Sequence, residues 1–301
     1  MRQRDAMIAR LRSTGDLWEP APGLVGLRGE TLARFEQIEA LVTDLCASET
    51  ADNWRIPQAL PLEVLERSGY FASFPQWLTL ASHLSDDAVA LERIARSERP
   101  ARDAAREAAP ASAALSPAVC YHVYGALAGT VIDAPKIVTA QGCCWRHEGS
   151  RFEPLARGWA FIMREIVCIG SEADCTAFRE RGLAIARRLA DALGLFGAIA
   201  EAEDPFFAPT ARGRAILQRL RSLKHEMMLL IGDGETTAAA SFNLHECFFG
   251  EAFGIRLPDG QPAHSACIAF GLERWLLASL MAYPIGTKRR ARERRMLGAR
   301  A

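Results

Sequence analysis

Charged and aromatic side chains cluster between residues 146 and 165, in a stretch that is otherwise apolar and β-like. Arg146 and Glu148 are two positions apart, so on a strand they share one face. There the arginine can bind a phosphate or carboxylate through two hydrogen bonds, and the glutamate can accept from an exocyclic amine. Arg157, Phe161 and Glu165 follow after a loop. The alternative is a solvated face of a half-buried strand, where charges also alternate with apolar residues.

This pattern resembles motif 2 of the class II aminoacyl-tRNA synthetases, which reads Arg-x-Glu, a variable loop, His or Arg-x-x-x-Phe, and a later acidic residue. Residues 269–274, Ala-Phe-Gly-Leu-Glu-Arg, resemble motif 3, although Ala269 replaces its first glycine. Residues 30–57 resemble motif 1, a long helix and a strand that ends in a proline, here Pro57. The resemblance implies an α+β fold with an antiparallel sheet flanked by helices.

The resemblance also implies a site that forms an adenylate from ATP. Arg146 would bind the α-phosphate and the substrate carboxylate, and Glu148 would read the adenine amino group. Phe161 and Arg274 would sandwich the adenine, and Arg157 with Arg274 would hold the β- and γ-phosphates. Because the reaction brings two anions together, fixed cationic donors such as Arg146 and Arg274, together with metal ions, supply most of the catalysis.

Three further residues complete the predicted nucleotide and substrate sites. Glu246, shortly before the motif 3 resemblance, is the candidate ligand for the magnesium ion that accompanies ATP. Glu226 and Asn243 stand where the seryl-tRNA synthetase-like group has a substrate-facing glutamate and asparagine. With Arg146, they are the predicted contacts to the amino acid.

Cys120, Glu165 and Cys267 form a candidate metal site. Residues 115–120 resemble the Leu-x-Pro-Thr-x-Glu segment of the seryl-like group, with Cys120 at the acidic position. Two thiolates and a carboxylate suit a tetrahedral zinc ion with an open fourth position. From the residues alone, buried free thiols and a paired glutamate are the alternative. Zinc-dependent, archaeal-type seryl-tRNA synthetases use a Cys, Glu, Cys set at corresponding places, which implies one zinc per subunit that takes the substrate's amino group.

The plan as a whole resembles the bacterial amino acid:carrier protein ligases. The segment before residue 30 is too short for the helical arm with which seryl-tRNA synthetases grip tRNA, and 36 basic residues balance 36 acidic ones. The resemblance implies a homodimer that loads glycine or alanine onto the phosphopantetheine thiol of an acidic carrier protein. The attacking thiol then belongs to the partner, so no cysteine of this chain need be the nucleophile.

The composition is that of a globular protein without a membrane-spanning segment. Half of the 301 residues are hydrophobic and about a quarter are charged, as in globular proteins. The eight cysteines form no CxxC pair, which argues against a thiol redox protein. No signal peptide and no apolar run long enough to span a membrane is present, so we expect a cytoplasmic protein. The basic cluster 288–295, or the arginines of residues 172–193, could receive an acidic carrier; the alternative is a solvated surface.

The elements that must position these residues follow from hydrophobic periodicity and capping signals. Residues 30–47 have helical spacing, and 137–148 and 159–169 are β-like runs joined by a long loop. Ser171 and Asp174 predict a capping box for a helix that Gly194 closes. A helix over 212–223 precedes two strands joined by a turn at 232–235, and the last strand, 264–270, runs into a helix. No P-loop or dinucleotide-binding glycine pattern follows a strand.

We therefore expect an N-terminal extension (1–29), a synthetase-like catalytic domain (30–285) and a basic C-terminal tail (286–301). Two alternatives remain: an enzyme that charges tRNA with a separate binding subunit, and a non-catalytic module derived from a synthetase. A non-catalytic module would be expected to have lost its phosphate-binding arginines, but Arg146, Arg157 and Arg274 are all present. The sequence does not rank glycine, alanine and serine, because pocket shape discriminates a single methylene or hydroxyl.

Overall fold

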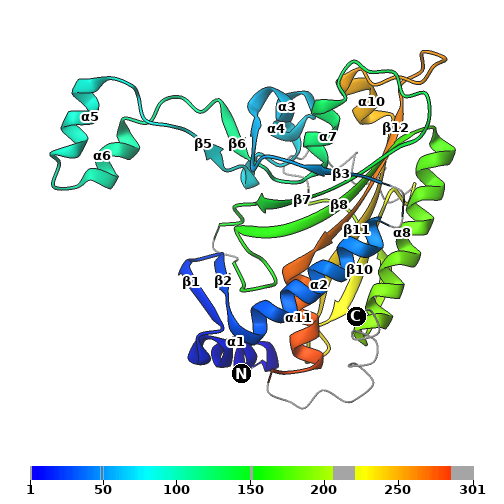
Figure 1. Cartoon of the computed structure of the whole chain (residues 1–301), viewed down its shortest axis with the longest axis horizontal. Coiled ribbons are helices and arrows are strands. Elements are labelled where there is room, and N and C mark those ends of the chain that lie inside the picture. The colour runs from blue at the N-terminus through cyan, green and yellow to red at the C-terminus, as the bar shows by residue number, and fades with distance from the viewer. Residues whose placement is uncertain (1, 48, 50, 150–151, 206–220, 286–301) are drawn as a thin grey trace.

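A seven-stranded sheet forms the centre of the computed structural model, which describes residues 2–47, 49, 51–149, 152–205 and 221–285 (Figure 1). All neighbouring strands are antiparallel except the edge pair β3–β7, which is parallel. The predicted antiparallel sheet is confirmed, and β3 adds a parallel strand at one edge. In order across the sheet the strands are β3 (Asp52–Arg55), β7 (Lys136–Trp145), β8 (Ala160–Gly170), β12 (His264–Gly271), β11 (Thr236–Glu246), β10 (Lys224–Leu230) and β9 (Gly197–Glu201).

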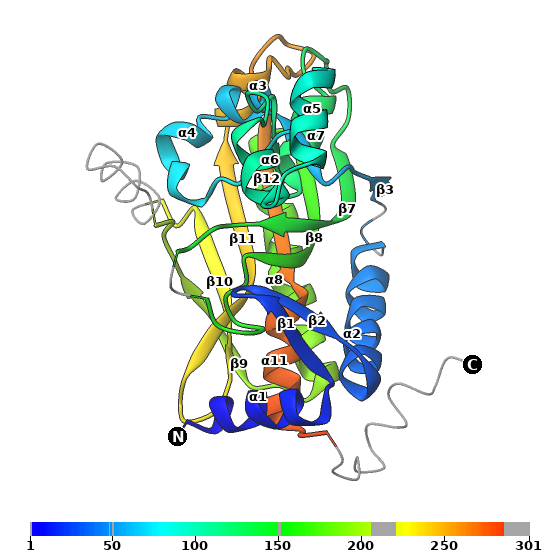
Figure 2. The same cartoon turned by 90° about the vertical axis from the view of Figure 1, so that its left-hand side faces the viewer.

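Three helices, α2 (Gly29–Ala47), α8 (Glu172–Leu193) and α11 (Leu272–Ala282), cover one face of this sheet (Figures 1 and 2). The predicted capping box of Ser171 and Asp174 opens α8, and Gly194 ends it in the left-handed conformation. Close packing requires Gly182 in α8, because a Cβ there would lie 2.1 Å from the Ile268 side chain. Side chains of β8 alternate: Ile166 packs under the helices, and Val167 on the opposite face.

The opposite face is only partly covered. Helices α7 (Cys120–Ala126) and α10 (Phe248–Phe253) pack on its upper part. Beside them lies a small sheet of β4 (Ala59–Pro61), β6 (Ala113–Leu115) and β5 (Leu80–Ala81), with α3 (Leu62–Arg67), α4 (Tyr70–Ser73) and the short 3-10 helix η1 (Pro75–Trp77). The rest of this face borders the cavity described below.

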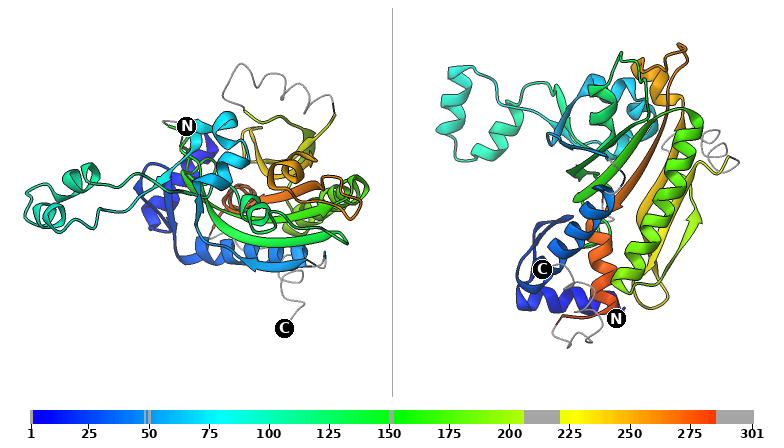
Figure 3. Two further views of the ribbon diagram at one scale, coloured as in Figure 1. Left: turned by 90° about the horizontal axis from the view of Figure 1, so that it is seen from above. Right: turned by 45° about the vertical axis from the view of Figure 1, so that its right-hand side comes forward.

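Two short helices form an arm that projects far from the sheet in the views of Figures 1 and 3. They are α5 (Ala88–Ala95), which Asp87 caps by accepting from the Val89 amide, and α6 (Pro100–Arg106). The chain segments that lead to and from them are joined by a β-bridge between Leu84 and Ala108. The sequence analysis placed no element in this region.

The N-terminal residues form a helix and a hairpin below the sheet. These are α1 (Gln3–Thr14), β1 (Leu17–Ala21) and β2 (Leu24–Leu27). Ile8 and Leu11 of α1 belong to the same buried core as α2, α8 and α11. Residues of the segment 2–29 therefore contribute apolar surface to the main core.

Most of the predicted elements are present, with local corrections. The turn at 232–235 joins β10 to β11, and β12 passes through Gly271 into α11. However, β7 ends at Trp145, so Arg146 and Glu148 do not lie on the strand as predicted. Arg146 retains one strand-like hydrogen bond, from its amide to the Trp159 carbonyl. Of the predicted helix 212–223, the described residues 221–223 are not helical; its remainder, and the basic tail 286–301, lie outside the described residues.

Among the residues that the structure describes, no helix combines the length and the apolar character that crossing a membrane requires.

Candidate active site

One cavity of about 870 Å³ opens on the partly covered face of the sheet. Every residue predicted for the site contributes to its lining, although these residues come from loops, strands and helices far apart in the sequence. They are Cys120, Arg146, Glu148, Arg157, Phe161, Glu165, Glu226, Asn243, Glu246, Cys267 and Arg274.

At one end of the cavity, Cys120, Glu165 and Cys267 meet, and we call these three residues the metal end. One sulfur or oxygen atom from each lies within 4.8 Å of those of the other two, and all three residues are buried. The sheet register explains the meeting: Glu165 of β8 lies opposite Ala269, so Cys267 of β12 is its diagonal neighbour on the same face. Cys120 arrives from the first residue of α7.

The Glu165 carboxylate is fixed by the start of α7. Its two oxygens accept the backbone amides of Val119 and Cys120, at 3.0 and 3.1 Å. Burial, with Cys267 nearby, raises the pKa of Glu165 to about 8. Two thiols and a carboxylate gathered in apolar surroundings fit a divalent cation, because its charge would compensate their ionised forms.

Two residues of β11 support this end. Asn243 Nδ2 donates to Cys267 Sγ at 3.4 Å, and His245 Nε2 lies 3.7 Å from the same sulfur. The His245 Nδ1 atom is in turn 3.2 Å from both Ser265 Oγ and Tyr124 Oη. From the sequence, His245 could line the pocket, but no partner could be assigned to it. Its spacing of two from Asn243 on a strand was the available signal, because it puts both side chains on one face.

Arg146, Glu148, Arg157 and Arg274 line the same cavity, and we call these four residues the phosphate end. The Arg146 Nε atom donates to the Pro117 carbonyl at 3.0 Å. Its guanidinium carbon lies 5.5 Å from the ring centroids of both Trp77 and Phe161. A backbone carbonyl and two aromatic faces thus hold this cation in place.

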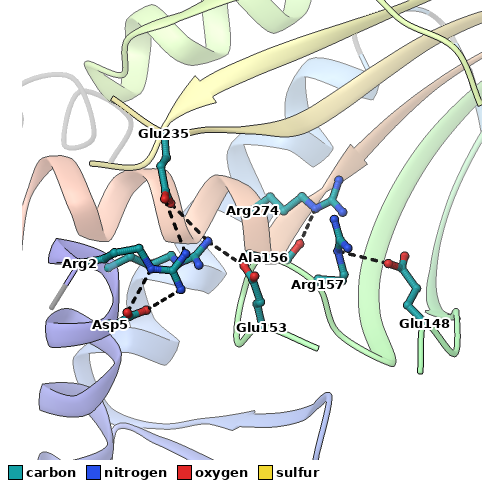
Figure 4. A network of polar contacts seen from close by, with 9 residues as sticks. Arg2, Asp5, Glu148, Glu153, Ala156, Arg157, Glu235 and Arg274 are labelled. Atoms are coloured by element: carbon teal, nitrogen blue, oxygen red, sulfur yellow. Dashed lines mark hydrogen bonds and ion pairs between the residues drawn. The ribbon is translucent and has the colours of Figure 1, made fainter. Parts of the chain in front are cut away.

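Backbone carbonyls also hold Arg274 (Figure 4). Its Nε atom donates to the Ala156 carbonyl at 2.8 Å, and Nη1 donates to the Ala238 carbonyl at 2.7 Å. Burial, with Arg146 nearby, lowers the pKa of Arg274. Arg157 pairs instead with Glu148, with 3.2 Å between Nε and Oε2. Three arginines that line one cavity have the charge and the donors to bind a polyanion.

Two of the predicted contacts, Glu226 to the amino acid and Glu246 to magnesium, already have ionic partners. Glu226 lies 3.1 Å from Lys224 Nζ, which also contacts Asp204 at 2.6 Å. Burial favours the neutral amine, but the two carboxylates outweigh it and raise the pKa of Lys224. Glu246 pairs with Arg221 at 2.5 Å and has a φ of 53°, a left-handed backbone conformation that is uncommon outside glycine. A carboxylate in such a conformation is typical of functional sites.

Comparison with known proteins places these features in context. The chain is 35% identical over 261 residues to amino acid–acyl-carrier-protein ligase 2 of Bradyrhizobium diazoefficiens, covering 85% of this chain and 78% of the relative. Ligase 1 of the same organism is 35% identical over 255 residues, covering 84% of this chain and 77% of the relative. No protein-family model matches the chain.

Synthetases that act on tRNA are more distant relatives. The type-2 serine–tRNA ligase of Methanococcus aeolicus is 26% identical over 262 residues, covering 81% of this chain and 50% of that protein. Among solved structures, M. kandleri SerRS in complex with A. aeolicus tRNASec superposes with a TM-score of 0.82 at 22% identity, covering 93% of this chain and 57% of that one. The chain thus spans little more than half of these proteins, and the structural likeness establishes the class II synthetase fold.

Proposed function

The chain belongs to the family of amino acid–acyl-carrier-protein ligases, and we propose that it activates glycine or alanine with ATP and transfers the aminoacyl group to the phosphopantetheine thiol of an acidic carrier protein. The observation that carries this proposal is that one cavity holds both a polyanion site of three arginines and a Cys, Glu, Cys cluster. A nucleotide triphosphate and an amino group can therefore lie side by side.

In the first step, a carboxylate oxygen of the amino acid attacks the α-phosphorus of ATP, and pyrophosphate leaves. Arg146, held by the Pro117 carbonyl and two rings, neutralises charge at the α-phosphate and orients the carboxylate. Arg274 and Arg157 hold the β- and γ-phosphates, and Phe161 stacks on the adenine. Because Arg157 pairs with Glu148, this ion pair must open for Arg157 to reach phosphate and Glu148 to reach the adenine amine.

In the second step, the carrier's thiolate attacks the carbonyl carbon of the adenylate, a thioester forms and AMP leaves. The cysteines of this chain that line the cavity lie at the metal end. Buried thiols held by neighbouring polar groups serve better as ligands than as a second nucleophile. We propose that the partner supplies the only reacting sulfur.

The finer assignments concern the metals and the assembly. Cys120, Glu165 and Cys267 would hold one zinc ion, since two thiolates and one carboxylate leave a fourth tetrahedral position for a substrate amine. When bound, the metal would supply a Lewis acid that fixes the amino group. Glu246 would bind the magnesium ion that accompanies ATP, after release from Arg221. Glu226 and Asn243 would contact the amino acid, and the enzyme would act as a homodimer.

Pyrophosphate exchange tests the first step directly. The purified protein is incubated with ATP, labelled pyrophosphate and each of a panel of amino acids, with and without a metal chelator. We expect exchange with glycine or alanine, and its loss in the chelated protein. If none of the amino acids supports exchange, the proposed activity is contradicted.

The acceptor is tested separately. Phosphopantetheinylated carrier proteins and total tRNA are each incubated with enzyme, ATP and labelled amino acid, and the products are weighed by mass spectrometry. We expect the carrier to gain one aminoacyl mass and tRNA to gain none. Label on tRNA alone would instead support a tRNA-charging enzyme, which the similarity to type-2 serine–tRNA ligases also allows.

A further inference from the structure

We propose that Arg4, on the N-terminal helix α1, is a positioning residue for the phosphate end of the cavity. Through an ion pair with Glu153 it holds residues 152–159, here called the motif 2 loop, which carry Arg157 and the carbonyl that receives Arg274. This inference rests on the proposed function, because the consequence of correct positioning is ATP binding.

The ion pair joins segments that are far apart in the sequence. Arg4 Nη1 lies 2.8 Å from Glu153 Oε2 and 3.8 Å from Glu235, and only 9% of the Arg4 side chain is exposed. Figure 4 shows Glu153 at the end of its loop nearest the N-terminal residues. An arginine this deeply buried loses most of its hydration and depends on its carboxylate partners. The Glu153 side chain, which is 45% exposed, is thus attached to α1 by this pair.

If Glu153 moved, the loop residues that line the cavity would move with it. The Glu153 amide donates to the Arg157 carbonyl at 2.9 Å, and the Arg157 amide donates back at 2.7 Å. Between them, Leu155 is buried in the main core with a φ of 61°. Ala156 presents its carbonyl to Arg274 Nε. This turn is short and closed at both ends, so Glu153 cannot shift without moving Arg157 and the Ala156 carbonyl.

The N-terminal hairpin provides a second attachment to the same loop. The Gly23 carbonyl, in the turn between β1 and β2, accepts the amides of Trp159 at 2.7 Å and Ala160 at 3.3 Å. Gly23 has a φ of 78°, and a Cβ there would lie 2.7 Å from both the Trp159 nitrogen and the Phe152 ring. The N-terminal residues therefore hold the motif 2 loop at two places, at Glu153 and at Trp159.

Helix α1 is itself fixed, so it can serve as a support. The Gln3 amide donates to Asp233 at 2.7 Å in the turn between β10 and β11. Strand β11 then supplies the Ala238 carbonyl that receives the second bond from Arg274. The N-terminal helix thus connects the two backbone segments that hold Arg274, namely the motif 2 loop and β11.

The test compares Arg4→Leu and Glu153→Gln with the native protein. We expect hydrogen exchange at the Glu153 and Arg157 amides to quicken, and the KM for ATP in pyrophosphate exchange to rise about tenfold, since small misplacements of binding groups are costly. The KM for the amino acid should rise less than the KM for ATP, because Cys120, Glu165 and Cys267 lie outside residues 152–159. Arg4→Lys should restore most of the ATP affinity. Arg12→Leu is the matched control: it removes another ion pair of α1, with Glu19, that includes no residue of the loop.

The outcomes separate this inference from the proposed function. Unchanged amide exchange in both variants overturns the positioning role, whatever the native protein catalyses. Quickened exchange with an unchanged KM for ATP also overturns it, as does an equal rise in both KM values, which would indicate general destabilisation. If the native protein shows no pyrophosphate exchange, the proposed function fails, and the amide exchange alone then decides whether Arg4 holds the loop.

Discussion

The metal end and the phosphate end of the cavity are built in different ways. Glu165 and Cys267 project from two adjacent central strands, and their meeting follows from the register of β8 and β12. At the phosphate end, Arg146 lies past the end of its strand, Arg157 is in the motif 2 loop, and Arg274 is in the first turn of α11. Their orientation depends on bonds to two loop carbonyls and one carbonyl of β11, and on one ion pair.

This difference indicates how each end can adapt. A site fixed by sheet register changes little when a ligand binds, because strand shifts break many hydrogen bonds at once. A site fixed by loop contacts can rearrange, as opening of the Arg157–Glu148 pair requires. We expect substitutions at the metal end to abolish chemistry and those at the phosphate end to weaken nucleotide binding and rate by degrees.

Removing a metal ligand should have the largest effect. For Cys267→Ser we expect loss of bound zinc and a fall in pyrophosphate exchange of more than about 100-fold, because even residues outside the ligand set typically cost roughly 10- to 100-fold. Elemental analysis measures the bound zinc, and a pyrophosphate exchange assay measures the rate. Cys168→Ser, which alters a buried thiol in the core on the other side of the sheet, is the control. A fully active, metal-free Cys267→Ser protein would remove the metal from the proposal.

Arg146→Ala tests the phosphate end with the metal end intact. Loss of this fixed cation should lower the exchange rate about 100-fold, comparable with loss of one donor to a developing anion. Zinc content should not change. If the metal were lost as well, the two ends would not be independent, and the comparison above would be wrong.

Asn243→Ala should have a smaller effect that distinguishes two roles of this residue. As a donor to Cys267 Sγ, it would support the metal, and its loss would weaken zinc affinity by about tenfold. As a contact to the amino acid, its loss would raise the KM for that substrate at saturating zinc. Titration with a metal indicator and exchange kinetics at fixed zinc separate the two roles.

Glu273 offers a pH-dependent test that concerns stability. Burial, with Glu39 nearby, outweighs the Ile162 amide and Arg274 and raises the pKa of Glu273 to about 7. The folded protein therefore keeps this proton where the unfolded chain, with a pKa near 4.5, has lost it. This stabilising contribution is complete below pH 4.5 and is lost as the pH rises through 7.

Glu273→Gln removes that titration and keeps an oxygen for the Ile162 amide. We expect its urea midpoint, relative to the native protein, to increase between pH 5 and pH 8. A difference between the two midpoints that is the same at every pH would show that Glu273 does not titrate in this range.

The sequence predicted the fold and the residues of the site better than the contacts that hold those residues in place. Arg-x-Glu, the later phenylalanine and the motif 3 arginine identify a family whose sheet brings them together, so the fold prediction is confirmed. The cavity groups all the predicted residues, although their roles remain predictions. The contacts of His245 were missed because its neighbours, Cys267 and Tyr124, are far away in the sequence. The contacts of Arg4 were missed for the same reason: nothing local marks an arginine whose partner lies 149 positions away (153 minus 4).

The projecting arm of α5 and α6 leaves the body and returns to it at one place, the bridge between Leu84 and Ala108. Because these two ends are already adjacent, the chain between them can be lengthened, shortened or exchanged for a modest entropic cost. The arm is therefore a module that evolution, or a protein engineer, can replace while the strands that carry the chemistry keep their registration.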